Sequence, residues 1–257
     1  MLKASFCEPV KSTEGFDDCS NDRIGVMVSH QYKCVFIHIP KCAGTSIESA
    51  LGHLEGHSGR GGQDHRTIRM LEPLTPKIFS STENVYETVR RLYRGSKPVA
   101  NPRNKYTLTK EQYSSYYKFS FVRNPWARAY SGYANVMRDK THQDALDITE
   151  KISLNEFLQR HAGKGMLRPQ LYWLKDLSGS VPLDFIGRFE SLAEDFQKVC
   201  DKLGIPRIEL PHKVQGSSKS YHEHYDEDSA ALIAEIYQEE IKRFGYTFEP
   251  QQVRAPL

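Results

Sequence analysis

The chain has 257 residues, a formal net charge of +3 and 26 % charged residues. This length suits one large α/β domain with a sizeable core, and the small net charge excludes the overall basicity of a dedicated nucleic-acid-binding protein. The 5 cysteines, an odd number at irregular spacing, form neither a disulfide framework nor a zinc motif. We therefore predict a protein of a reducing compartment, the cytoplasm, without a metal centre.

The first residues differ in composition from the rest. Residues 1–30 are polar and uneven, and we interpret them as a lead-in segment to a single domain at residues 31–250. They lack the apolar core of a signal peptide, and no stretch of the chain approaches the roughly 18 apolar residues of a membrane span. Only residues 24–28 are apolar, and we expect a short edge strand there.

A strand and a helix are predicted on either side of a tight turn. Residues 34–39 are apolar and β-branched, as in a buried strand. After the turn, Thr45 or Ser46 can cap a helix whose apolar face begins at Ile47. The turn itself, residues 40–46, therefore lies at the carboxyl end of a strand and the amino end of a helix.

The composition of this turn is that of an anion-binding loop. It contains Lys41, small residues and two hydroxyls, so backbone N–H groups, hydroxyl groups and one ammonium group can converge on a phosphate or sulfate. The lysine precedes Gly44, whereas it follows the second glycine in the usual nucleoside-triphosphate loop. A strand–helix turn that binds nothing has the same local pattern and is the alternative.

Glycine content and helical periodicity define the next segments. Residues 52–65 are too rich in glycine for regular structure, so we expect a mobile loop, and a short helix follows from Thr67. Residues 81–95 predict an amphipathic helix. Its apolar residues are Val85, Val89, Leu92 and Tyr93. Its terminal basic residues, interpreted as a solvated face rather than a substrate-binding patch, are Arg90, Arg91, Arg94 and Lys97.

Strands and helices alternate in the second half of the chain. We predict strands over residues 116–122 and 182–189. Helices are predicted after Trp126, Ser153 and Ser191, and before Gly245. This alternation indicates an α/β fold, a parallel sheet flanked by helices, with a site at the carboxyl ends of the strands.

A second basic site is predicted where the 116–122 strand ends. Arg123 lies at the carboxyl end of that strand, and Ser131 lies about two helical turns further, on the side of the next helix that faces the strand end. A guanidinium and a hydroxyl there can bind one phosphate. From these residues alone, pairing of Arg123 with a carboxylate is an equal alternative.

Together the two motifs resemble those of sulfotransferases that use 3′-phosphoadenosine 5′-phosphosulfate (PAPS). Phe36-Ile-His-Ile-Pro-Lys-Cys-Ala-Gly-Thr-Ser46 resembles their 5′-phosphosulfate loop, and Phe121-Val-Arg-Asn-Pro-Trp-Ala-Arg-Ala-Tyr-Ser131 resembles their 3′-phosphate motif. The likeness covers most of residues 32–247. It is greatest to the carbohydrate-type family, sulfotransferase family 2, which includes heparan and chondroitin sulfotransferases and bacterial members.

This resemblance implies a P-loop-kinase-like sulfotransferase fold and a role for each matching residue. It implies that Lys41 contacts the bridging oxygen of the sulfuryl donor, that the residues after it wrap the 5′-phosphate, and that Arg123 and Ser131 hold the 3′-phosphate. It also places Phe189 near the adenine. The implied donor-binding set is Lys41, Cys42, Ala43, Gly44, Thr45, Ser46, Arg123 and Ser131.

Two departures from the family pattern concern the loop and the acceptor side. Cys42 stands where threonine is usual, which removes one hydroxyl, and a variable insertion lies near residues 73–115. The acceptor is expected to be a hydroxyl compound, and family likeness favours a carbohydrate. The sequence indicates no nucleic-acid partner and does not fix an oligomeric state.

A histidine is predicted as the catalytic base. His65 follows the glycine-rich segment, an unshifted imidazole pKa suits a base at neutral pH, and His-x-Thr here resembles the family's histidine-bearing segment. We interpret His38 as a structural hydrogen-bonding residue, and Glu48 is the alternative base. The predicted reaction is in-line displacement of the sulfuryl group of PAPS by the acceptor hydroxyl.

Two other functions remain open. A phosphoryl-transferring P-loop enzyme is disfavoured because no apolar strand ends in an aspartate suited to Mg²⁺. A non-catalytic glycan-binding module of the same fold is disfavoured because Lys41, Arg123, Ser131 and a candidate base are all present.

Overall fold

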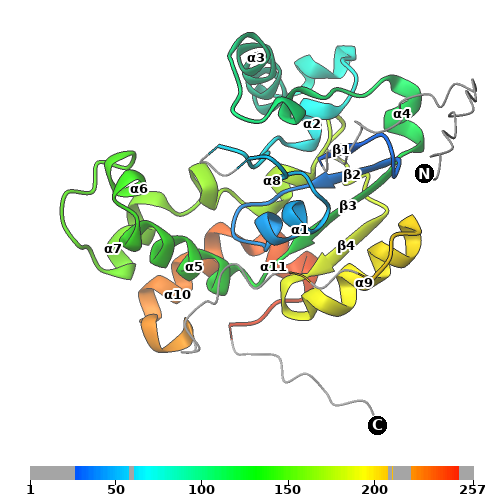
Figure 1. The fold of residues 1–257 in the computed structure, drawn as a ribbon. Helices are drawn as coiled ribbons and strands as arrows, with labels where there is room; N and C mark the ends of the chain where they lie inside the picture. Colours follow the sequence, from blue (N-terminus) through cyan, green and yellow to red (C-terminus); the bar gives the residue numbers. More distant parts are fainter. Residues whose placement is uncertain (1–26, 58–60, 208–209, 211–220, 249–257) are drawn as a thin grey trace, which may run out of the picture.

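The structure is a computed structural model that describes residues 27–57, 61–207, 210 and 221–248. It contains a central sheet with helices on both faces (Figure 1). The strands, which lie side by side in chain order, are β1 (Val28–Ser29), β2 (Cys34–Ile37), β3 (Tyr117–Val122) and β4 (Phe185–Arg188). Strands β2, β3 and β4 are parallel, and β1 is antiparallel to β2. The predicted α/β class is confirmed, with a mostly parallel sheet.

The helices follow the predicted alternation. They are α1 (Gly44–Ala50), α2 (Ile68–Leu71), α3 (Thr82–Ser96), α4 (Lys110–Ser115), α5 (Pro125–Arg138), α6 (Lys140–Asp144), α7 (Leu154–His161), α8 (Gln170–Leu174), α9 (Leu192–Leu203), α10 (Glu227–Ile236) and α11 (Gln238–Phe244). The helix predicted before Gly245 is interrupted at Tyr237, which separates α10 from α11. Among the described residues, no helix is long and apolar enough to cross a membrane.

The sheet is buried on both faces. Successive residues of a strand point to opposite sides, and each side of β2 packs in an apolar cluster. Phe36 of β2 packs with Phe119 of β3, Ile47 of α1 and Phe196 of α9 in one apolar cluster. Its neighbour Val35 belongs to the larger cluster, to which α2, α5, α8 and α10 contribute. Burial on both faces explains why β2, Cys-Val-Phe-Ile, has a continuous apolar sequence instead of an alternating one.

The register of the sheet places the ends of β2 and β3 together. Ile37 pairs with Ser120, and the Ser120 hydroxyl donates a hydrogen bond to the Ile37 carbonyl oxygen (2.7 Å). The segment that follows β2 and the one that follows β3 therefore leave the sheet at the same edge. This is the edge at which open parallel sheets bind ligands.

Part of the predicted lead-in belongs to the sheet. Met27 and Val28 are fully buried, and the Phe36 amide donates to the Met27 carbonyl oxygen (3.0 Å). The expected edge strand is β1, at Val28–Ser29. The remainder of the lead-in, residues 1–26, lies outside the described residues.

Helix α3 forms where predicted, but its apolar side faces outward and its polar side faces the protein, the reverse of an ordinary amphipathic helix. Its apolar residues, including Val89 and Leu92, are exposed. Its polar side is turned inward, where Glu87 is fully buried. The predicted solvated basic face is wrong for Arg91, whose guanidinium donates to the Glu72 carbonyl oxygen (2.6 Å).

Candidate functional site

The loop between β2 and α1 has an unusual backbone. Lys41 and Ala43 have φ angles of 69° and 64°, in the left-handed region that side chains disfavour. Such strain is stored mainly at functional sites, and alternation of left-handed with right-handed residues forms anion-binding concavities of backbone N–H groups. Residues 41–46, called the anion loop below, therefore have a backbone suited to bind an anion.

The predicted helix cap is wrong, because Ala43 is the N-cap of α1 and no side chain caps the helix. The predicted capping hydroxyls remain in the first turn instead. The Thr45 hydroxyl accepts one hydrogen bond from Gln63 (3.5 Å), and the Ser46 hydroxyl makes none with the described residues. Both hydroxyls can therefore donate to a ligand in the loop.

Gly44 fixes the position of the anion loop against His38. A Cβ atom at Gly44 would lie 1.9 Å from His38 Cδ2 and 2.1 Å from Nε2. The His38 ring cannot move aside easily, because it is buried and its Nδ1 atom is hydrogen-bonded to Glu48 (2.9 Å). The His38 ring therefore packs against the loop at Gly44. This agrees with the prediction that His38 is a structural hydrogen-bonding residue.

We expect Gly44→Ala to destabilise the protein by about 1–3 kcal/mol, the usual cost of overpacking a core. The comparison is Gly95→Ala in α3, where no heavy atom lies within 4 Å of the new Cβ, so that this change should be neutral or slightly stabilising. Urea denaturation measures both changes. Equal stability of the two variants would show that the His38 ring does not confine Gly44.

The Lys41 ammonium has no hydrogen bond or ion pair with the described residues. Burial, and next the charges of Arg123 and Arg138, lower its pKa to about 8. A partly buried cation among other cations, without a carboxylate partner, is an electrostatic arrangement that favours a bound anion.

Arg123 joins the second motif to the first. Its Nη1 atom donates to the Lys41 carbonyl oxygen (3.1 Å), and its guanidinium lies over the Phe189 ring, 3.9 Å from the centroid. Its Nε atom is buried and has no hydrogen-bond partner among the described residues. Arg123 is therefore not consumed by a carboxylate pair, and the structure brings together the two motifs that the sequence separates.

Two buried residues that received no role from the sequence hold the motifs in place. Gln170 Oε1 accepts hydrogen bonds from the Arg123 amide (2.8 Å) and from Cys42 Sγ (3.4 Å). Arg128 Nε donates to the Pro40 carbonyl oxygen (3.0 Å) at the start of the anion loop. Both residues lie in segments that resemble the family. Only the fold shows that they hydrogen-bond to residues about 40 positions or more away in the sequence.

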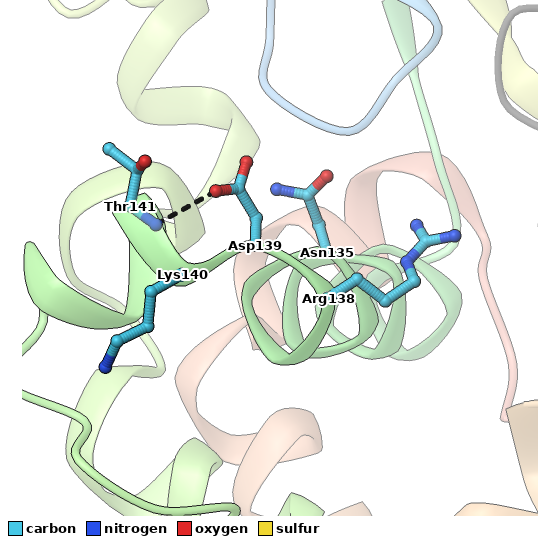
Figure 2. A pocket seen from close by; sticks show the side chains of 5 residues that line it. All are labelled: Asn135, Arg138, Asp139, Lys140 and Thr141. Atoms are coloured by element: carbon cyan, nitrogen blue, oxygen red, sulfur yellow. Dashed lines mark hydrogen bonds between the residues drawn. The ribbon is translucent and has the colours of Figure 1, made fainter.

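Ser131 lies on α5, and its hydroxyl makes no hydrogen bond with the described residues. Asn135 and Arg138 follow at helical spacing on the same side, and they line a pocket of about 570 Å³ with Asp139, Lys140 and Thr141 (Figure 2). The Lys140 side chain points away from the other four. This pocket extends the α5 surface that contains Ser131.

His65 lies beside His38, the ring that packs against the anion loop. Its ring centroid is 4.1 Å from that of His38, and its Nδ1 atom lies 3.4 Å from the His38 carbonyl oxygen. Burial, and next the neighbouring His38, lower the pKa of His65 to about 3, whereas the sequence suggests an unshifted value. The ring is therefore neutral at physiological pH, so that one of its nitrogens can accept a proton.

The other two candidate bases are enclosed. His38 and Glu48 are 2 % and 0 % exposed, and they hydrogen-bond to each other. Burial raises the pKa of Glu48 to about 7 and lowers that of His38 to about 3. Of these three candidate bases, only His65 is partly exposed.

The described part of the segment before His65 is hydrogen-bonded to the insertion. Asn101 Nδ2 donates to the carbonyl oxygens of His53 (3.0 Å) and Gly62 (3.2 Å). Asn104 Oδ1 is hydrogen-bonded to the His53 ring (2.8 Å). These contacts concern the described parts of residues 52–65. They place the insertion against the loop that ends at the candidate base.

Comparisons with known proteins agree with this geometry. A family model described as "Sulfotransferase family" matches residues 25–247. An uncharacterized protein of Archaeoglobus fulgidus is 33 % identical over 97 residues, which are 38 % of this chain and 75 % of that protein. No solved structure matches the chain significantly. Among the described residues, no group of three or more metal-ligating side chains is arranged to hold a metal ion.

Proposed function

The chain belongs to the sulfotransferase family, and we propose that it transfers the sulfuryl group of PAPS to a hydroxyl acceptor. Membership of this family supports sulfotransfer activity in general, and members of the family generally use PAPS as the donor. The observation that supports this donor is the contact between the two phosphate motifs, in which Arg123 Nη1 donates to the Lys41 carbonyl oxygen (3.1 Å). A donor with phosphates at both its 5′ and 3′ positions requires two adjoining anion sites.

The residues fit the donor chemically. The anion loop offers backbone N–H groups, two hydroxyls and the Lys41 ammonium for the phosphosulfate. For the 3′-phosphate, Arg123 offers a buried Nε atom and Ser131 offers a hydroxyl, neither of which has a hydrogen-bond partner in the part of the chain that the structure describes. The carboxylate of Glu190 is nearby, but it accepts hydrogen bonds from the Asn124 amide (2.7 Å) and the Tyr246 hydroxyl (3.2 Å). Glu190 therefore has partners of its own.

The proposed reaction is an in-line displacement. The acceptor oxygen forms a bond to sulfur while the bond between sulfur and the bridging phosphate oxygen breaks. The acceptor proton passes to His65, and negative charge develops on the bridging oxygen, where the Lys41 ammonium stabilises it. The products are the sulfated acceptor and adenosine 3′,5′-bisphosphate. The anionic donor, once bound beside His65, raises the pKa of this ring and makes it a stronger base.

We propose that the fold is the P-loop-kinase-like sulfotransferase fold, which is related to that of nucleotide kinases, and that the chain does not transfer phosphoryl groups. The described parallel strands β2, β3 and β4 are followed by His38, Arg123 and Phe189. None of these is an aspartate suited to hold Mg²⁺, which disfavours a P-loop phosphotransferase. A carbohydrate acceptor is proposed from family likeness. The buried thiols of Cys34 and Cys42, which form no disulfide with the described residues, support a reducing compartment, the cytoplasm.

Incubation with PAPS labelled in its sulfuryl group, and a panel of glycans, lipids and small alcohols, tests this function. We expect label on one class of hydroxyl compound and release of adenosine 3′,5′-bisphosphate. Mg-ATP labelled in its γ-phosphate is the control donor and should transfer nothing. Binding of PAPS without transfer to any compound would favour the glycan-binding module, and transfer from ATP would contradict the proposed donor.

A further inference from the structure

Glu240, on α11, is a buried carboxylate that the proposed reaction does not use. The residue is 0 % exposed. Its Oε2 atom accepts a hydrogen bond from the Gln170 backbone amide, and its Oε1 atom accepts one from Gln170 Nε2 (2.9 Å). Burial raises the pKa of Glu240, while the charge of Arg128, the next largest influence, lowers it. Because a buried carboxylate is costly without such partners, Glu240 and Gln170 form one unit.

Glu240 determines how the side-chain amide of Gln170 is turned. A carboxylate can only accept hydrogen bonds, so the amide nitrogen, and not the amide oxygen, faces Glu240. In this orientation Gln170 Nε2 also donates to the Arg123 carbonyl oxygen (2.9 Å), while Oε1 accepts from the Arg123 amide (2.8 Å) and from Cys42 Sγ (3.4 Å). The reversed amide would oppose donor to donor and acceptor to acceptor at Arg123. Glu240 therefore selects the one orientation in which Gln170 binds both motifs.

The bridge through Gln170 lies beyond the paired part of the sheet. The pairing of β2 with β3 ends at Ile37 and Ser120. Cys42 and Arg123 both lie beyond that pair. The Arg123 side chain reaches the anion loop by itself, but it is long and flexible, whereas Gln170 holds the Arg123 backbone through both its N–H and its C=O groups. The distance between the two motifs therefore depends on the orientation of Gln170.

We propose that Glu240 is a positioning residue that, through Gln170, sets the spacing between the anion loop and Arg123, so that one donor molecule can place its 5′- and 3′-phosphates in both at once. The proposal rests on the proposed function, because it takes a nucleotide with two phosphates as the ligand. Each site has its own anion-binding groups and can bind one phosphate by itself. A ligand bound at one site reaches the other at high effective concentration only when the spacing matches. Loss of Glu240 should therefore affect ligands with two phosphates and spare those with one.

Calorimetric titration of Glu240→Gln with adenosine 3′,5′-bisphosphate, adenosine 5′-phosphate and adenosine 3′-phosphate tests this proposal. The NH₂ group of the new glutamine opposes one of the two Gln170 donors, so the amide orientation is no longer fixed. The Kd of the bisphosphate should rise about 10-fold or more, whereas that of each monophosphate should change by less than about twofold. A merely structural change would instead reduce the number of binding sites or weaken all three nucleotides alike.

Glu239→Gln is the matched control, because it makes the same substitution at the preceding residue of α11, where the side chain is exposed and paired with Lys175 (2.8 Å). It should leave the binding of all three nucleotides unchanged. Glu240→Asp keeps the charge but shortens the side chain, so it provides a milder second variant whose loss should be selective in the same way. Thermal melting shows that each variant folds.

A double-variant cycle and amide exchange test the path through Gln170. Gln170→Met keeps the length of the side chain but removes its hydrogen bonds. Adding Glu240→Gln to it should weaken the bisphosphate little further, because both changes break the same bridge. In the free protein, the Arg123 amide should exchange with deuterium about 10-fold faster in Glu240→Gln than in the wild type. Equal weakening of the three nucleotides, or losses from the two variants that simply add, would overturn the positioning role.

Failure of the proposed function would give a different result. A wild type that binds the bisphosphate no more tightly than the two monophosphates contradicts the two-site donor and the positioning role together. A wild type with the expected preference for the bisphosphate, retained in full by Glu240→Gln, overturns the positioning role alone.

Discussion

Replacing Lys41 with methionine should lower turnover by about 10²–10³-fold or more at every pH, because the variant loses the charge that stabilises the departing oxygen. Methionine keeps the length and apolar stem of the side chain, so packing is largely preserved. Donor affinity should fall as well, since a charge-assisted contact is worth about 1.5–3 kcal/mol. Steady-state kinetics with PAPS and the acceptor found in the transfer assay, together with donor titration, measure both effects.

Lys33→Met is the matched control for Lys41→Met. Lys33 also has a left-handed backbone, with a φ angle of 47°, but it is exposed and lies before β2, away from the anion loop. The control should keep wild-type turnover and donor affinity. If Lys41→Met retained most of its turnover, another group would have to stabilise the departing oxygen.

The lowered pKa of Lys41 also predicts a pH dependence. A lysine is charged below its pKa, and burial lowers this pKa to about 8. The value of kcat/KM for PAPS, which depends on ionisations of the free enzyme, should therefore fall as the pH rises through about 8. Lys41→Met should lack this falling limb. A profile that stays level up to about pH 10, near the ordinary lysine pKa, would contradict the lowered value.

Replacing His65 with asparagine should lower turnover by about 10²–10⁴-fold, the usual contribution of a general base, while donor affinity stays near that of the wild type. The asparagine amide can still donate to the His38 carbonyl oxygen, as the ring is placed to do, but it cannot take up a proton. His142→Asn is the control, because His142 is partly exposed and lies on α6. Donor titration distinguishes loss of the base from loss of the donor site.

The pH profile of kcat/KM should show no rising limb from His65 near neutrality. Burial lowers its pKa to about 3, so the ring of the free enzyme stays neutral through the range in which an ordinary histidine, with a pKa of about 6.5, titrates. A rising limb near this value that disappears in His65→Asn would show that the ring is less enclosed. Turnover retained by His65→Asn would assign the base to Glu48 or His38.

The sequence predicts the strands and the two phosphate motifs because their signals are local. The apolar run before Lys41 and the aromatic run before Arg123 are buried parallel strands, and the parallel topology brings their ends to one edge. The sequence does not reveal the left-handed Ala43 that caps α1, because the preference of capping hydroxyls is only statistical and side chains rarely adopt this backbone.

The orientation of α3 and the environment of His65 cannot be predicted from the sequence for another reason. Periodicity shows which side of α3 is apolar, but buried partners such as Thr67 and Leu177 decide which side faces the protein. The pKa of His65 depends on burial beside His38, which follows β2 and lies 27 positions earlier in the sequence. The hydrogen bonds of Asn101 and Asn104 to the glycine-rich segment likewise join residues far apart in the sequence. Each of these features requires contacts between remote segments.

The central claim is that the anion loop and Arg123 form one donor site with separate places for the 5′- and 3′-phosphates. Calorimetric titration of the wild type and Arg123→Ala with adenosine 3′,5′-bisphosphate and with adenosine 5′-phosphate tests it most directly. Arg123→Ala should weaken binding of the bisphosphate by about 30- to 160-fold, or 2–3 kcal/mol, and should change binding of the 5′-phosphate little. Equal weakening for both nucleotides would remove Arg123 from the 3′-phosphate site, and a wild type that binds neither nucleotide would contradict the donor site as a whole.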